Sequence, residues 1–200
     1  MSEIDVPESH PRYQSLLTRH RIEDGVDRGI TSRQGLIAEG RGEAFDYLLG
    51  ERTIPSADDA ARAAAALLLL ADRPVLSVNG NVAALVPAET VDLAAAVDAD
   101  IEVNLFNRTD ERMRAIVTHL RERGADEAGV AVRGLDADAR IPGLDHERAK
   151  VDADGIGGAD VVVVPLEDGD RAEALAAMGK SEVVIDLNPL SRSAQAATVP

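Results

Sequence analysis

The chain of 200 residues contains no cysteine, which removes several kinds of site at once. Disulfide bonds, zinc sites with cysteine ligands and a cysteine nucleophile are all excluded. The four histidines are scattered, without the H-x-x-x-H spacing that places two imidazoles on one helix face. They are His10, His20, His119 and His146. We therefore predict no metal site built from the protein's own side chains.

Long apolar runs and a basic leader are missing as well. The longest apolar run, from Ala63 to Ala71, is far shorter than the roughly 20 residues that span a bilayer. The N-terminus, from Met1 to Asp5, is acidic and lacks the basic-then-apolar order of a secretion signal. We expect a cytoplasmic protein with no membrane partner.

Positive charge and aromatic residues are scarce. Lys and Arg number 21 against 36 Asp and Glu, so the net charge is −15, and the only lysines are Lys150 and Lys180. This composition is typical of a protein kept soluble in concentrated salt, where a Debye length of about 3 Å at 1 M weakens self-repulsion. We expect a halophilic source, with ordinary acidic solubility as the alternative. Nucleic acid is not an expected partner, because phosphate backbones favour Lys and Arg clusters.

The first part of the sequence has helical patterns. Leu and Ile recur among charged residues between Ser15 and Arg28. Thr31 to Gln34 and Ser56 to Asp59 have the spacing of capping boxes, so we expect each to open a helix. The second of these helices, ending near Ala71, is apolar almost all round, and we expect it to be buried on most sides.

From Pro74 onward, short apolar runs alternate with helical patterns. The runs predict strands at Val75–Val78, Ile101–Leu105, Val130–Arg133, Val161–Val164 and Val183–Leu187. Helices are predicted between them at Ala88–Val97, Thr109–Arg123 and Arg171–Met178. The four consecutive valines of the fourth strand favour a parallel strand covered on both faces.

This alternation predicts an α/β fold with an open, mostly parallel, Rossmann-like sheet that is flanked by helices. No internal repeat or low-complexity linker divides the chain. We therefore expect a helical N-terminal region, residues 1–73, packed on an α/β region, residues 74–200, as one compact unit. The loop-rich stretch from Gly134 to Gly158 is the least regular part of the second region.

Polar segments lie at or directly after the carboxyl ends of four of the predicted strands, where the ligands of open parallel sheets bind. They are Asn79–Asn81, Asn104–Arg108, Pro165–Arg171 and Asp186–Ser193. Each segment alone is compatible with an ordinary turn, since Asn, Asp, Gly and Pro populate loops for backbone reasons. Their convergence on one edge of the sheet favours a binding site.

The common nucleotide motifs are absent from the sequence. No G-x-x-x-x-G-K-[ST] loop occurs, and Gly155 to Gly158 precedes a predicted strand, which is the wrong place for a dinucleotide fingerprint. Asp152 to Gly155 lacks the further acidic ligands of a calcium loop, so we interpret it as a turn. An oxidoreductase with a dinucleotide cofactor is the least favoured class.

Several arginines stand beside small or polar residues, a setting typical of phosphate and carboxylate recognition. Arg41 lies between two glycines, and Arg192 lies between two serines. For other arginines of this acidic chain, a surface salt bridge is the better interpretation. Lys150 lies two residues after Arg148. The sequence does not decide whether this lysine has a function or is retained by chance.

Several longer strings resemble the archaeal phosphopantothenate synthetase family, and the similarity runs from about Ser9 to the end of the chain. The strings are Ser9–Tyr13, Gly35–Ala38, Gly40–Leu48, Gly50–Thr53, Ser77–Asn81, Ile141–Leu144, His146–Arg148, Pro165–Arg171 and Asp186–Arg192. The resemblance implies a homodimeric ATP-dependent ligase of coenzyme A biosynthesis. Such an enzyme joins 4-phosphopantoate to β-alanine through an acyl adenylate and releases AMP and diphosphate.

The resemblance also implies roles for individual residues. The implied ATP contacts are Arg19, Arg41, Asp186, Leu187, Asn188, Arg192 and Ser193. For the acyl substrate we expect contacts from Asn79, Asn81, Asn104 and Arg108. Arg148 and Lys150, together with Mg²⁺, are expected to neutralise phosphate charge. His146 is expected to serve either as the base for the amine or as a structural histidine.

Members of this family continue beyond the position of Pro200, where the resemblance implies a further pair of ATP-contacting residues. Ala197 to Pro200 has the pattern of the start of another strand. The chain is therefore expected to be shorter than its family. A non-catalytic nucleotide- or phosphometabolite-binding module of the same fold is the alternative to the ligase.

Overall fold

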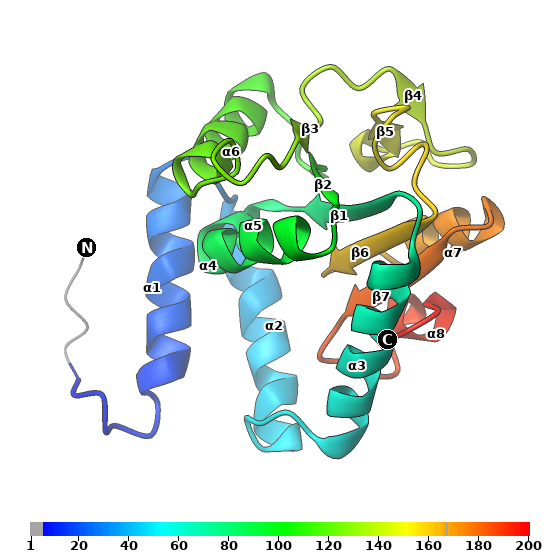
Figure 1. The fold of residues 1–200 in the computed structure, drawn as a ribbon. Helices are drawn as coiled ribbons and strands as arrows, with labels where there is room; N and C mark the ends of the chain where they lie inside the picture. The colour runs from blue at the N-terminus through cyan, green and yellow to red at the C-terminus, as the bar shows by residue number, and fades with distance from the viewer. Residues whose placement is uncertain (1–5, 167) are drawn as a thin grey trace.

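The computed structural model describes residues 6–166 and 168–200, and a five-stranded parallel sheet lies at its centre (Figure 1). The strands are β1 (Pro74–Val78), β2 (Asp100–Val103), β3 (Val132–Arg133), β6 (Val161–Pro165) and β7 (Ser181–Ile185). Their spatial order is β3-β2-β1-β6-β7, and every pairing is parallel. The predicted α/β fold with a mostly parallel sheet is confirmed.

Helices precede the sheet and flank it. The first three are α1 (Tyr13–Asp27), α2 (Arg33–Leu49) and α3 (Pro55–Leu70). The others are α4 (Gly80–Leu85), α5 (Pro87–Ala96), α6 (Asp110–Glu122), α7 (Gly169–Ala177) and α8 (Arg192–Ala196). None of the described helices has the length and apolarity that crossing a membrane requires.

The sheet separates two apolar cores because successive side chains of a strand point to opposite faces. On β1, Leu76 and Val78 belong to the core shared with α5, α6 and the end of α3. Val75 belongs to the other core, which α7 and residues 139–156 complete. The valines of β6 divide between the two cores in the same way, so this strand is covered on both faces as its sequence predicts.

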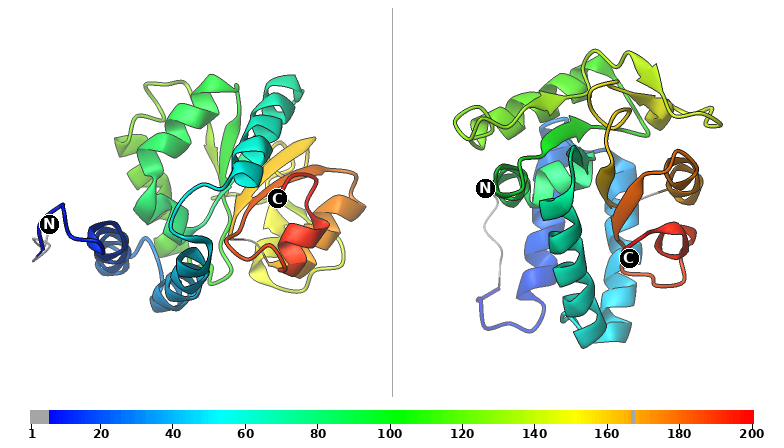
Figure 2. Two further views of the ribbon diagram at one scale, coloured as in Figure 1. Left: turned by 90° about the horizontal axis from the view of Figure 1, so that it is seen from below. Right: turned by 45° about the vertical axis from the view of Figure 1, so that its right-hand side comes forward.

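Helices α1, α2 and α3 project from one side of the sheet (Figure 2). The expectation that α3 is buried on most sides is wrong, because only Leu68 of this helix is buried. Leu69 and Leu70 are 67% and 83% exposed. The last turns of α3 pack on the sheet, and the rest of the helix extends away from it.

Neither predicted capping box forms. Helix α2 begins after Ser32, whose side chain makes no cap hydrogen bond. The hydroxyl of Thr31 instead donates to Asn81 Oδ1 at 2.6 Å. The Thr31 side chain that a capping box would use thus makes a tertiary contact. Helix α3 begins at Pro55, one residue before the predicted cap at Ser56.

Residues 134–158 are more regular than the sequence indicates. They contain a short antiparallel pair, β4 (Ala139–Arg140) and β5 (Lys150–Val151), with the 3₁₀ helix η1 (Glu147–Ala149) between them. This segment covers one face of the sheet and carries cationic side chains toward its carboxyl edge. Beyond α8, Val199 forms an isolated parallel bridge with Val183 of β7.

Candidate active site at the carboxyl edge of the sheet

The strands β1 and β6 are neighbours, and their following segments leave toward opposite faces of the sheet. Such a point is where open α/β sheets bind ligands. Asn79, directly after β1, donates from Nδ2 to the carbonyl oxygen of Pro165 at 2.8 Å. Its Oδ1 accepts from the backbone N–H groups of Asn81 and Val82, at 3.0 and 3.1 Å, and so caps α4. One side chain therefore links the ends of both strands.

The backbone is strained at the same place. Leu166, the first residue after β6, has φ of 54°, in the left-handed region. For a bulky side chain this conformation costs on the order of 1–3 kcal/mol, and such strain gathers at functional sites.

Helix α2 runs along the carboxyl edge and forms one wall of the candidate site. At its beginning, Asn107 Nδ2 donates to Gln34 Oε1 at 2.6 Å. Gly35 lies so close to Asn81 that a Cβ would collide with its Oδ1. Further along, a Cβ on Gly42 would lie 3.3 Å from Leu187 of the segment after β7. These contacts place the helix across the ends of β2, β1 and β7.

Arg41 shares a face of α2 with Gln34, because seven residues are nearly two helical turns. Arg41 is exposed and makes no hydrogen bond or ion pair with the described residues. Arg19 of α1 is less available, since its Nη2 pairs with Glu43 Oε2 at 2.6 Å. Burial opposes ionisation of Glu43, but hydrogen bonds from Arg19 and Tyr47 lower the pKa of this carboxyl.

The segment after β7 is ordered by its own side chains. Asp186 Oδ1 accepts from the backbone N–H of Asn188 at 2.9 Å, and Asn188 Oδ1 accepts from that of Leu190 at 3.0 Å. Arg192 is exposed and pairs with Glu173 of α7 at 2.8 Å. Ser193 is buried at the start of α8. The residues predicted to contact ATP thus come from α1, α2 and this segment.

At the end of β2, Asn104 anchors the segment with η1 and β5. Its Nδ2 donates to the carbonyl oxygens of Arg148 and Lys150 at 3.3 and 2.9 Å. Its Oδ1 accepts from Arg148 Nε at 3.2 Å. Buried Arg148 then reaches over β1 to pair with Asp168, before α7, at 2.8 Å. This chain of contacts joins the ends of β2 and β6.

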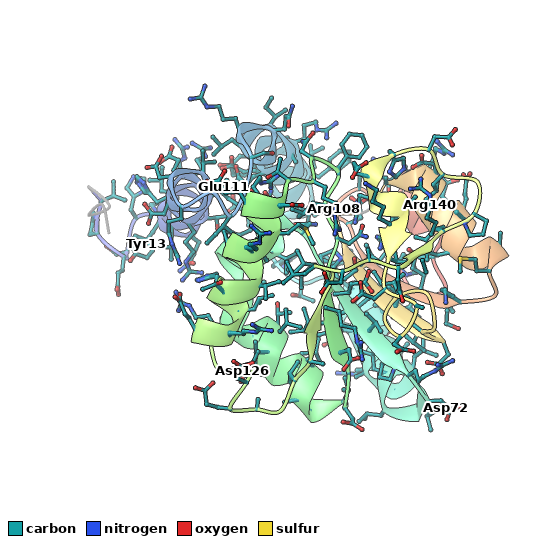
Figure 3. The ribbon with its side chains drawn as sticks, turned by 90° about the horizontal axis from the view of Figure 1, so that it is seen from above. Tyr13, Asp72, Arg108, Glu111, Asp126 and Arg140 are labelled. Carbon is teal, nitrogen blue, oxygen red and sulfur yellow. The ribbon has the colours of Figure 1, made fainter. Side chains whose placement is uncertain are left out.

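Two other cations lie near this network. Lys150 Nζ pairs with Glu147 at 2.8 Å, and this ion pair lowers the pKa of the Glu147 carboxyl. Arg108 Nη2 donates to the carbonyl oxygen of Gly134 at 2.5 Å. Figure 3 labels Arg108 and Glu111 at the end of the molecule near α2, whereas Asp72 and Asp126 mark the opposite end.

His146 lies between an acid and an aromatic ring. Its Nε2 is 3.2 Å from Asp170 Oδ2, and its ring centroid is 5.3 Å from that of Phe106. Its Nδ1 is buried and has no hydrogen-bond partner among the described residues. If Nε2 carries the proton that is shared with Asp170, Nδ1 is the nitrogen that can accept one.

Three further residues of this region were not predicted from the sequence as site residues. Arg171 of α7 is fully buried and donates from Nη2 to Ser77 Oγ at 3.1 Å. Glu102 of β2 is also fully buried, and burial raises its pKa to about 7. The signal for Glu102 was a lone acid within an apolar strand. Phe106 is an exposed aromatic residue in a chain with 2% aromatic residues.

A separate cavity of about 740 Å³ lies between α1, α4, α5 and α6. Leu17 and His20 line it on one side and His119 on another. None of the predicted site residues lines this cavity. We place the candidate site at the carboxyl edge because the cations and the strained backbone gather there. Within the described residues, no group of three or more His, Asp or Glu side chains is arranged to hold a metal ion.

Comparison with known proteins gives one consistent result. The family model described as phosphopantothenate/pantothenate synthetase matches residues 56–200. The chain is 59% identical over 196 residues to the 4-phosphopantoate–beta-alanine ligase of Thermococcus onnurineus, covering 98% of this chain and 74% of that one. It is 57% identical over 195 residues to the ligase of the same name from Methanosarcina mazei, covering 98% and 75%. The chain therefore belongs to the phosphopantothenate/pantothenate synthetase family.

Proposed function

We propose that this chain is an AMP-forming ligase of coenzyme A biosynthesis that joins 4-phosphopantoate to β-alanine and yields 4′-phosphopantothenate. The observation that carries this proposal is the identity of 57–59%, over 98% of the chain, to proteins named for the same activity. The arginine and lysine side chains at the carboxyl edge support it, because ATP and the acyl substrate both bring phosphate groups. The helices before β1 and the α/β region after it act as one unit in this proposal, since α2 forms a wall of the site.

ATP is assigned to the half of the edge between α2 and the end of β7. The assigned residues are Arg19, Arg41, Asp186, Leu187, Asn188, Arg192 and Ser193. Arg41 has its guanidinium free of described partners and can meet a phosphate directly. Arg19 and Arg192 must first exchange the carboxylates of Glu43 and Glu173 for the nucleotide.

The acyl substrate is assigned to the half at the ends of β1 and β2. Arg108, Arg148 and Lys150 supply the charge that attracts its carboxylate and phosphate. The amides of Asn79, Asn81 and Asn104 are bonded within the chain, and we assign them to the walls of this half.

The proposed reaction has two steps. A carboxylate oxygen of 4-phosphopantoate attacks the α-phosphorus of ATP, and diphosphate leaves to give the acyl adenylate. The amine of β-alanine then attacks the acyl carbon, and AMP leaves. Mg²⁺ would arrive with ATP and neutralise phosphate charge. His146, oriented by Asp170, is the residue we propose to take the amine proton.

A second copy of the chain is the proposed partner. Exposed apolar residues lie on the projecting helices, and Ile37, Leu48 and Leu70 are 65%, 80% and 83% exposed. Burial of these side chains between two copies would remove them from water. We place the dimer in the cytoplasm, in line with the expectation from the sequence. Sedimentation of the purified protein measures its oligomeric state. A single monomeric species would contradict the proposed dimer.

Turnover with ATP, 4-phosphopantoate and β-alanine tests the activity. We expect 4′-phosphopantothenate and AMP in equal amounts. His146→Ala should lower kcat by roughly 10²- to 10⁴-fold, as expected for loss of a general base. His20→Ala, which removes a histidine of α1 outside the assigned site, should leave kcat unchanged. Nucleotide binding without any amide product would favour the non-catalytic module.

A further inference from the structure

Phe106 is an exposed aromatic side chain at the carboxyl edge, with 56% of its surface accessible. A single exposed apolar residue needs no explanation by itself, since such residues are common on protein surfaces. The surroundings of this one distinguish it. The polar residues Asn107 and Arg108 follow it directly, and its ring lies beside the ring of His146 with an interplanar angle of 34°.

The loop that carries Phe106 is held in place on both sides. Before it, Asn104 is buried and hydrogen-bonded to two carbonyl oxygens of the η1–β5 segment. After it, Asn107 donates to Gln34 at 2.6 Å, and Arg112 Nη1 donates to the carbonyl oxygen of Asn107 at 2.5 Å. The backbone that carries the ring is therefore held in place before any ligand binds, which lowers the cost of ordering this contact on binding.

The chemistry of the acyl substrate calls for one apolar contact, an argument that rests on the proposed function. 4-Phosphopantoate carries a carboxylate and a hydroxyl at one end and a phosphate at the other. Between them lies a quaternary carbon with two methyl groups, the only apolar part of the molecule. Arg108 and Arg148 can meet the charged ends, but a guanidinium gives no preference for methyl groups.

An aromatic ring at a nucleotide site would more commonly stack on adenine, so the position along the sheet decides between the two ligands. Phe106 follows β2, whereas five of the seven residues assigned to ATP follow β7. In the order β2-β1-β6-β7, these strands are three spacings apart, or about 14 Å. The ring therefore lies in the half of the edge that we assign to the acyl substrate.

We propose that Phe106 is a specificity-determining residue whose ring packs against the two methyl groups of 4-phosphopantoate. The matched probe is 2-hydroxy-4-phosphobutyrate, the same acid without both methyl groups. Burial of two methyl groups corresponds to a preference of roughly tenfold in kcat/KM for the natural acid. Phe106→Ala should remove most of this preference and leave the KM for ATP unchanged, whereas Phe106→Leu should keep part of it.

Leu93→Ala is the control, because Leu93 is exposed on α5, which leads to the amino end of β2. It should keep the full preference. An undiminished preference in Phe106→Ala would overturn the proposal, and a raised KM for ATP would reassign the ring to adenine. If the protein makes no amide product, the ligase proposal fails on its own. Calorimetric titration of the two acids into the parent protein and Phe106→Leu then decides the role of the ring.

Discussion

Asn79 and Pro165 are joined by a hydrogen bond of 2.8 Å from Nδ2 to the carbonyl oxygen, so the ends of β1 and β6 are held at a fixed separation. The same side chain caps α4 through Oδ1. The ends of these two strands lie between the ATP half and the acyl half of the proposed site. Their geometry therefore depends on one amide.

Asn79→Ala should lower the free energy of unfolding by about 1–3 kcal/mol, because the helix cap and the link to Pro165 are both lost. The matched control is Ser32→Ala at the N-cap of α2, whose side chain makes no cap bond. Urea unfolding of the two variants should separate them clearly. Equal losses of stability in the two variants would mean that the hydrogen bonds of Asn79 do not stabilise the fold.

Arg41→Ala should weaken ATP binding by one to two decades in Kd, since a charge-assisted hydrogen bond to phosphate is worth about 1.5–3 kcal/mol. Arg33→Ala removes another exposed arginine from the beginning of the same helix and should change Kd little. Titration calorimetry with ATP measures both variants. The assignment of ATP to α2 fails if the two substitutions have the same effect.

Glu102 should make stability depend on pH near neutrality. Burial raises its pKa from 4.5 to about 7, so the folded protein binds this proton more tightly than the unfolded chain. The free energy of unfolding should therefore fall between about pH 4.5 and 7, by roughly 3 kcal/mol. Above this window the ionised carboxylate stays buried at a cost.

Glu102→Gln isolates this effect, because it removes the titration and leaves the other groups unchanged. His119 acts in the opposite direction, since burial lowers its pKa and its contribution is lost as the pH falls. The stability of the parent protein minus that of the variant should decrease from pH 5 to pH 8 at constant KCl. A difference that stays constant with pH would contradict the prediction.

The net charge of −15 should make folding depend on salt. Screening of carboxylate repulsion should raise the free energy of unfolding with KCl up to molar concentrations. Urea midpoints at low and molar KCl measure the change. Full stability in low-salt buffer would contradict the inference of a halophilic source.

The sheet could be predicted from sequence because its central strands are apolar on both faces. The four valines from Val161 to Val164 fit a parallel strand that is covered on both faces better than any other element. Helix α3 could not be predicted in the same detail. A run of Ala and Leu indicates a helix with an apolar surface. It does not indicate whether that surface packs within the same chain or against another one. In this structure only Leu68 of the helix is buried.

The location of the polar segments could also be predicted, because parallel strands bring their carboxyl ends to one edge. The partners of the individual side chains could not. Thr31 has the spacing of a local cap, but its hydroxyl bonds to Asn81, 50 residues later. Asn104 has the expected position for a ligand contact, but its amide holds the backbone of Arg148 and Lys150. Such pairings depend on tertiary packing, which single-residue patterns do not encode.

The central claim is that the carboxyl edge activates 4-phosphopantoate as an acyl adenylate. The most direct measurement is exchange of labelled diphosphate into ATP by this protein in the presence of 4-phosphopantoate without β-alanine. We predict exchange that requires 4-phosphopantoate and is reduced in Arg41→Ala. Amide synthesis that produces ADP and inorganic phosphate, with no diphosphate exchange, would contradict the adenylate mechanism.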